Sequence, residues 1–140
     1  WTVEELDLGY RSSAVATSQV VVEADLSLRS GSGEDGELIL AEIVRWRREN
    51  QPGGQNSGSV FTNPSGDSAG RLIDLVGARG LRIGTASVSE KHANFIQTET
   101  GGLAADVVLV MAEVRRRVVE DLGVDLNAET VLVGFDGETE

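Results

Sequence analysis

The sequence predicts an α+β fold, in which a small, mainly antiparallel sheet packs with helices. Strand-like and helix-like segments are interspersed without the regular β-α-β alternation of a doubly wound parallel sheet. Between Leu103 and Leu122, apolar residues recur at the spacing of an amphipathic helix. The 140 residues suffice for one domain or slightly more, with a real hydrophobic core.

The N-terminal third contains one predicted strand and one predicted helix. Gln19–Leu28 is rich in β-branched residues and partly alternating, which predicts a strand, and residues 5–13 before it are expected to form a short strand or loop. The glycines and serines of Arg29–Glu37 are typical of a linker and mark the best candidate for a domain boundary. Residues 35–50 predict a helix, with acidic residues early and arginines late, as the helix dipole favours. Its buried side is expected to carry Leu40, Ile43, Val44 and Trp46.

The stretch GSVFTNP, Gly58 to Pro64, has two interpretations. In the mechanical one, glycine frees the backbone, Val60 and Phe61 form a short strand, and Asn-Pro starts a turn. In the chemical one, Ser59 stands on a bend at a strand edge, where it can hand a proton to a bound substrate. The local sequence alone leaves both open.

The second half of the chain predicts a helix and two strands, then a long helix and a last strand. A helix over 68–77 is capped by Asp67 or Ser68 and ends at Gly77. The segments LRIGTASV and ANFIQTE are expected to be strands joined by SEKH. The long amphipathic helix stops at Gly123, and Thr130 to Gly134 is the last strand.

Composition excludes several classes of function. The formal net charge of −11 disfavours nucleic acid and anionic membranes as partners. The absence of cysteine excludes disulfides and thiolate chemistry, and no apolar run is long enough to span a membrane. Several arginines nevertheless cluster, and each cluster is either a site for a small anionic ligand or a solvated helix face. The solvated-face interpretation fits Arg115 to Arg117 best. The clusters are Arg45, Arg47 and Arg48, then Arg79 and Arg82, then Arg115 to Arg117.

Common catalytic motifs are missing. The glycines of GARGLRIG have the wrong spacing for a dinucleotide-binding loop, and there is neither a Walker loop nor a GxSxG elbow. The single histidine, His92, leaves a serine–histidine pair without independent support. No EF-hand spacing occurs, and no metal site is predicted.

Four stretches in order resemble one family. They are GYRSS, RRENQP, NSGSVFTNP with SAGRLID, and GTASVSEKHANFI with its downstream helix and LNAETVLVG. Together they resemble the C-terminal portion of UDP-N-acetylenolpyruvoylglucosamine reductase, also called UDP-N-acetylmuramate dehydrogenase, the cytoplasmic flavoenzyme of peptidoglycan precursor synthesis. Each motif is short, and the ordered set is what is specific.

The resemblance implies an organisation and a reaction. Residues 1–30 would be the end of a FAD-binding domain, 31–36 a linker, and 37–140 the substrate-binding domain. FAD would be held mostly by a region outside this sequence, so the chain alone would not catalyse the reaction. The family reduces UDP-N-acetylglucosamine enolpyruvate with NADPH, by way of FAD. Hydride reaches the terminal carbon of the enol ether, and the carbon beside the carboxylate then needs a proton.

The resemblance also implies three catalytic residues. Ser59 matches the family's proton donor, which can protonate a carbanionic centre although a hydroxyl is a weak acid. Arg11 matches an arginine that can hold the substrate carboxylate in a bidentate fork. Glu129 matches a catalytic glutamate, which we expect either to be protonated or to orient the carboxylate together with Arg11. Each residue also has a purely structural alternative. Ser59 would satisfy its own turn, Arg11 would be an ordinary arginine at a strand end, and Glu129 would be a solvated residue before the last strand.

Five further positions match substrate contacts of the family, and each has an alternative. Asn63 would bind the diphosphate portion or simply start the turn before the proline. Lys91 and His92 would contact substrate or lie in a solvated loop. Tyr10 would contact substrate or pack, and Arg47 would bind an anion or anchor its loop.

Some positions depart from the family pattern. Thr62 stands where the family commonly has lysine, which puts any lysine contact there in doubt. The short connection from Val88 to Gly102 indicates the form of the family without an added tyrosine loop. The alternative function is a non-catalytic nucleotide-sugar binding module of the same fold, although such a binder would need no proton donor.

Overall fold

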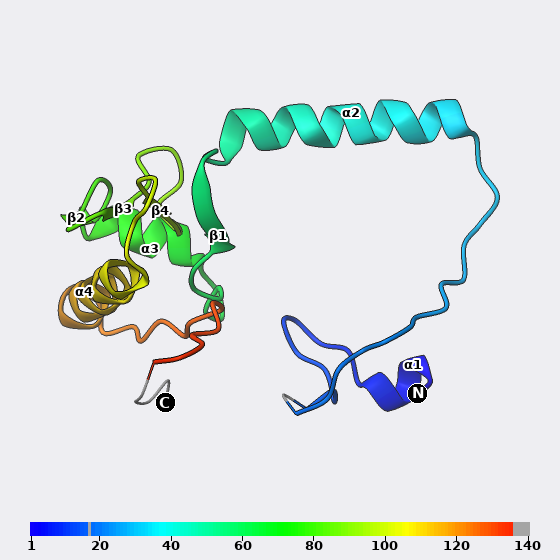
Figure 1. Cartoon of the computed structure of the whole chain (residues 1–140), viewed down its shortest axis with the longest axis horizontal. Helices are drawn as coiled ribbons and strands as arrows, with labels where there is room; N and C mark the ends of the chain where they lie inside the picture. The colour runs from blue at the N-terminus through cyan, green and yellow to red at the C-terminus, as the bar shows by residue number, and fades with distance from the viewer. Residues whose placement is uncertain (17, 136–140) are drawn as a thin grey trace. The chain divides into compact units, whose positions relative to one another are not determined.

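The computed structural model describes residues 1–16 and 18–135. The chain divides into two compact units, Trp1–Glu42 and Ile43–Glu140, and each is described by itself. Helix α2 (Gly33–Asn50) begins in the first unit and ends in the second (Figure 1).

The first unit opens with a short capped helix, α1 (Val3–Leu6). The Glu5 N–H donates to Thr2 Oγ1 and the Thr2 N–H donates to Glu5 Oε2, a reciprocal capping box. A tight turn follows, closed by two backbone hydrogen bonds between Gly9 and Ser12. The expected short strand or loop is therefore a loop that follows one helical turn.

The predicted strand at Gln19–Leu28 is wrong. In the described residues of this segment no strand forms, and the side chains of Val20, Val22 and Leu28 are exposed. A strand exists only when a neighbouring strand takes its backbone hydrogen bonds. No described strand pairs with this segment, so its β-branched composition has no ladder to join.

The helix predicted over 35–50 is confirmed as α2, which begins at Gly33, inside the glycine- and serine-rich stretch. Ser32 starts it, since its Oγ accepts from the Asp35 N–H at 3.3 Å. The predicted buried side is wrong: Leu40, Ile43, Val44 and Trp46 are all exposed. The spacing of these residues predicts an apolar stripe on the helix, but spacing alone does not supply a surface that buries it.

The second unit contains one antiparallel sheet with two helices, which confirms the predicted α+β class. The strands are β1 (Gln55–Ser59), β2 (Arg82–Ile83), β3 (Ala86–Val88) and β4 (Phe95–Thr98), in the order β1-β4-β3-β2. All three pairings are antiparallel. Helix α4 (Ala104–Leu122) packs on β2, β3 and β4, and α3 (Ala69–Leu75) packs on α4 (Figure 1).

The prediction of one strand at LRIGTASV is wrong, because the segment folds into the hairpin β2–β3. Gly84, with a φ of +53°, is in the connecting turn. Thr85 donates from its N–H and from its Oγ1 to Asp106 Oδ2 of α4, each at 2.7 Å. The turn is thereby tied to the first turn of the long helix.

Helix α4 confirms the predicted amphipathic helix. Val110, Val114 and Val118, spaced four apart, are almost completely buried against the sheet and α3. Gly123, with a φ of +68°, ends the helix in the left-handed conformation, as predicted. Leu126 then returns to the core.

Helix α3 confirms the predicted short helix and chooses between its two caps. Ser68 is the N-cap, because its Oγ accepts from the Arg71 N–H at 3.3 Å. Asp67 instead forms an ion pair with the Arg71 guanidinium.

The predicted last strand, Thr130 to Gly134, is wrong, and so is the short strand at Val60–Phe61. Strand β1 ends at Ser59, and beyond it only an isolated bridge joins Phe61 to Ala128. Val131 and Val133 are 83% and 85% exposed and pair with no described strand. The segment lies beside β1, since Thr130 to Val133 line one groove with Gln55 to Ser57, but no strand pairing forms there among the described residues.

Candidate functional site

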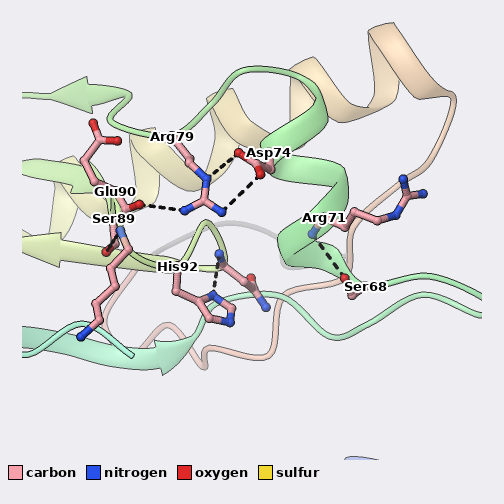
Figure 2. Close-up of polar contacts among 9 residues, drawn as sticks. Ser68, Arg71, Asp74, Arg79, Ser89, Glu90 and His92 are labelled. Carbon is pink, nitrogen blue, oxygen red and sulfur yellow. Dashed lines mark hydrogen bonds and ion pairs between the residues drawn. The ribbon is translucent and has the colours of Figure 1, made fainter. Parts of the chain in front are cut away.

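An open pocket of about 410 Å³ lies in the second unit, where β1, α3 and the loop between β3 and β4 meet. Its lining is mostly polar and includes four of the predicted site residues. The lining residues are Ser59, Asn63, Ser68, Gly70, Arg71, Asp74, Arg79, Lys91, His92, Ala93 and Asn94. Figure 2 shows several of them around the β3–β4 loop and α3.

A β-bulge places Ser59 at this pocket. Asn56 pairs with Gln97, but Ser59 rather than Gly58 pairs with Phe95, so β1 carries one extra residue. Gly58 has a φ of +84°, which suits glycine, and its N–H donates to Asn56 Oδ1 at 3.0 Å. In unbroken pairing Gly58 would stand opposite Phe95. The bulge therefore puts a hydroxyl where the plain ladder would put a glycine.

Asn63 holds the start of α3. Its Oδ1 accepts a hydrogen bond from the Ala69 N–H at 3.0 Å, while the residue stays exposed on the pocket wall. The turn role expected for Asn63 is thus present. It leaves the amide group at the rim, where the predicted ligand contact would be made.

The loop between β3 and β4 brings Lys91 and His92 to the same pocket. Lys91 donates from Nζ to the Arg48 carbonyl oxygen at the end of α2. His92 is held on three sides: its Nδ1 accepts from the Asn94 N–H at 3.2 Å, and its ring meets Phe95 edge-on at 4.8 Å between centroids. On the third side, an added Cβ at Gly70 would lie 3.4 Å from His92 Cε1. Because Nδ1 accepts, the neutral ring carries its proton on Nε2.

Arg79 is a pocket residue that sequence reasoning counted only within an arginine cluster. Its guanidinium donates to both carboxylate oxygens of Asp74, at 2.5 and 3.2 Å, and to the Glu90 carbonyl oxygen at 2.7 Å (Figure 2). The hydrogen bond from Arg79 lowers the pKa of Asp74. Gly77 and Gly84 flank Arg79 and Arg82 and indicate a loop, but nothing in the sequence places Asp74 beside Arg79.

Arg71 is the second arginine on the pocket wall, and Asp67 holds it. The hydrogen bonds from Arg71, with a backbone bond from Ser68, lower the pKa of Asp67 to about 2. The pocket thus presents Arg71, Arg79 and Lys91, while two carboxylates fix the arginines in place.

Glu129 lies near Ser59 in the fold without lining the pocket. Its backbone N–H donates to the Val60 carbonyl oxygen at 2.8 Å, one residue beyond Ser59, and its side chain is half-buried. The structure therefore brings residue 129 beside the GSVFTNP stretch, across 69 positions of sequence (129 less 60).

The other predicted site residues are not among those that line this pocket. Tyr10 and Arg11 belong to the first unit, where the Arg11 guanidinium lies 5.9 Å from the centroid of the Tyr10 ring. Arg11 has a φ of +55°, a left-handed conformation uncommon for arginine. Arg47 lies on α2 and is not among the residues that line the pocket.

His92 gives a prediction about pH. Its pKa lies below the ordinary 6.5, first because burial disfavours the charged ring and second because Arg79 repels it. Between the folded pKa and 6.5 the unfolded chain binds more protons than the folded one, so the stability contribution of this group is present above 6.5 and is lost as pH falls. Because His92 is the only histidine, its ring protons can be titrated by NMR without assignment variants.

The titration midpoint should lie below 6.5 in the wild-type chain and should rise in Arg79→Gln, which removes one of the two causes. A wild-type midpoint at or above that value would contradict the buried, Arg79-facing placement of the ring.

Neither a membrane span nor a metal cluster is found in the part of the chain that the structure describes. No helix there is both long and apolar enough to cross a bilayer. Likewise, no three acidic or histidine side chains of residues 1–16 and 18–135 gather in a way that could hold a metal ion.

Fold and site together define the class: a small α+β domain whose antiparallel sheet and short helix enclose an open polar pocket. Residues 50–133 match the family model described as UDP-N-acetylenolpyruvoylglucosamine reductase, C-terminal domain. That match covers more than half of the sequence, and the chain belongs to this family. The resemblance found in the four sequence stretches is thereby confirmed.

Relatives of the same name extend the match. The UDP-N-acetylenolpyruvoylglucosamine reductase of Syntrophotalea carbinolica is 44% identical over 96% of this chain and 45% of its own length. That of Paramagnetospirillum magneticum is 46% identical over 94% of this chain and 43% of its own. The crystal structure of the Thermus caldophilus enzyme (MurB) superposes with a TM-score of 0.75 at 40% identity, over 90% of this chain and 45% of that one. The chain thus spans a little under half the length of the relatives that it matches.

Proposed function

We propose that this chain is the C-terminal part of an oxidoreductase that reduces UDP-N-acetylglucosamine enolpyruvate to UDP-N-acetylmuramate in peptidoglycan precursor synthesis. The observation that carries the proposal is the bulge in β1. It presents Ser59 at the wall of a pocket that also holds Asn63, Lys91 and His92. A proton donor beside hydrogen-bond donors and fixed cations suits an anionic substrate that must be protonated on carbon.

The pocket fits the diphosphate of a nucleotide sugar. Arg71 and Arg79 line the pocket, and each is fixed in place by an ion pair with a carboxylate, Asp67 or Asp74. Lys91, His92 Nε2–H and the Asn63 amide add donors along the same wall. In the proposed complex these groups would hold the diphosphate and the sugar, and Ser59 would lie at the enolpyruvyl end.

Ser59, Glu129 and Arg11 would share the chemical step. Ser59 Oγ would hold the proton for the carbon beside the substrate carboxylate. Glu129, whose backbone N–H donates to the Val60 carbonyl oxygen, would orient the substrate carboxylate. Arg11 would pair with that carboxylate and disperse the enolate charge. Tyr10 and Arg47 are proposed as further substrate contacts.

The family implies FAD, and the residues of this pocket do not fit a flavin site. A dinucleotide site of the Rossmann type has a glycine loop at the head of a helix, whereas α3 is seven residues long and begins after a serine cap. We therefore assign no flavin contact to the pocket. We propose that residues 1–30 end a FAD-binding domain, that 31–36 link the two domains, and that 37–140 bind substrate. When bound, the flavin supplies hydride that originates from NADPH.

Two further features complete the proposal. Six residues, 89–94, connect β3 to β4, a short connection that supports the form of the family without an added tyrosine loop. The proposed location is the cytoplasm, where the nucleotide-sugar substrate and NADPH would be available.

The experiment uses a protein of the relatives' full length that contains this chain, loaded with FAD. After reduction by NADPH, addition of the enolpyruvyl substrate should reoxidise the flavin and yield a product heavier by two hydrogens, read by mass spectrometry. If the substrate bound but the flavin stayed reduced, the chain would be a nucleotide-sugar binding module and the enzyme proposal would be wrong.

A further inference from the structure

The Asn94 side chain takes the place of a strand partner for the backbone next to Ser59. The β1–β4 ladder ends at the Ser59–Phe95 pair. Beyond it, the Val60 N–H donates to the Asn94 carbonyl oxygen at 2.9 Å and the Phe61 N–H donates to Asn94 Oδ1 at 3.0 Å. In return, Asn94 Nδ2 donates to the Phe61 carbonyl oxygen at 2.8 Å. One amide group thus supplies the acceptor and the donor that another strand would have supplied.

The opposite edge of the same segment is bonded to the C-terminal part of the chain. The Val60 carbonyl oxygen accepts from the Glu129 N–H at 2.8 Å, and the Thr62 N–H donates to the Asn127 carbonyl oxygen at 2.9 Å. The backbone just after Ser59 therefore lies between Asn94 on one side and the Glu129 segment on the other.

Asn94 also reaches the ligand side of the pocket. Its backbone N–H donates to His92 Nδ1 at 3.2 Å, a bond that aspartate or leucine at position 94 would keep. Only 4% of Asn94 is exposed, so losing a partner there leaves a buried polar group unsatisfied.

We propose that Asn94 is a positioning residue, whose side chain holds the backbone after Ser59 in register with the Glu129 segment. The side chain acts through the N–H and the carbonyl oxygen of Phe61, and it has no assigned chemical step of its own. The inference rests on the proposed function of Ser59. Ser59 could be the proton donor whether or not Asn94 positions it, so the role of Asn94 is a separate claim.

The test compares Asn94→Asp with Asn94→Leu in the full-length, FAD-loaded protein. At about pH 8 the aspartate is a carboxylate: it can accept from Phe61 but faces the Phe61 carbonyl oxygen without a proton to donate. Flavin reoxidation by saturating substrate should then be slowed about 10²-fold, the scale of a small misplacement of a reacting group. Protonated at lower pH, the acid can both accept and donate, so its rate should recover toward the wild-type rate. Asn94→Leu lacks both hydrogen bonds and should stay slow at every pH.

Other groups titrate nearby, so each rate is divided by the wild-type rate at the same pH. The titratable and charged groups around the segment are Arg71, Asp74, Arg79, Lys91, His92 and Glu129. Asp106→Ala is the matched control, since it also removes two hydrogen bonds from the fold, both to Thr85 and outside the pocket. It should lose stability and keep the reoxidation rate, and flavin reduction by NADPH should be unchanged in every variant.

A second measurement needs neither flavin nor turnover. In this 140-residue chain, the backbone amides of Val60 and Phe61 should be among the slowly exchanging ones, and Asn94→Asp should speed exchange at Phe61 at high pH. Fast exchange of the Phe61 amide in the wild-type chain would overturn the inference, even if a variant failed to fold. If the wild-type protein turned over and both Asn94 variants reoxidised the flavin at the wild-type rate, the role given to Asn94 would be wrong while the proposed function stood. A wild-type protein that is never reoxidised by substrate would overturn the proposed function as well.

Discussion

Replacing Ser59 with alanine is expected to slow flavin reoxidation by substrate at least about 10²-fold, the scale of losing a general acid. Reduction of the flavin by NADPH should proceed at its usual rate, because that step needs no proton from the pocket wall. Stopped-flow absorbance of the flavin separates the two half-reactions. The substitution removes one oxygen atom from a half-buried site and leaves the bulge and the ladder in place.

Ser57→Ala is the matched control for this result. Ser57 lies two residues earlier in the same strand, is exposed and lines a different groove. It should reoxidise at the wild-type rate. If Ser59→Ala did so too, the proton would come from another group and the role given to Ser59 would be wrong.

Replacing Phe61 with alanine is expected to destabilise the second unit by about 3–5 kcal/mol, the cost of deleting a buried aromatic ring. Phe61 is 3% exposed and belongs to the core formed by the sheet and helices α3 and α4. Urea unfolding followed by circular dichroism measures the loss. Tryptophan fluorescence is a poor reporter here, since Trp1 and Trp46 are both exposed and lie outside that core.

Val131→Ala serves as the comparison for Phe61. This side chain is exposed, and its truncation should change the free energy of unfolding by no more than about 0.5 kcal/mol. A loss at Phe61 as small as that at Val131 would contradict the packing of the GSVFTNP stretch into the core.

The elements that could be predicted are those whose signal is local. Helix α4 was predictable because its spacing of apolar residues and its burial repeat with the same period, and Gly123 ends it by its own backbone preference. The segments at 19–28 and 130–134 were mispredicted for the opposite reason. Their composition favours strands, but pairing depends on a partner elsewhere in the chain, which composition does not report.

The candidate site divides in the same way. Ser59, Asn63, Lys91 and His92 could be named only from the family resemblance that the ordered set of motifs carries, and the structure gathers them around one pocket. Asn94 could not be named, because its importance rests on hydrogen bonds to a residue 33 positions away. Arg79 likewise gains its orientation from Asp74 and from a carbonyl oxygen 11 positions on. No periodicity or motif encodes such contacts.

The segment that ends at Thr130 meets the GSVFTNP stretch through main-chain atoms of its own: the Asn127 carbonyl oxygen and the N–H groups of Glu129 and Thr130. These backbone bonds do not depend on the identity of the side chain at position 129, provided that it is not proline. Glutamine or aspartate at position 129 would therefore keep the same main-chain anchor while changing the charge or the length of the side chain.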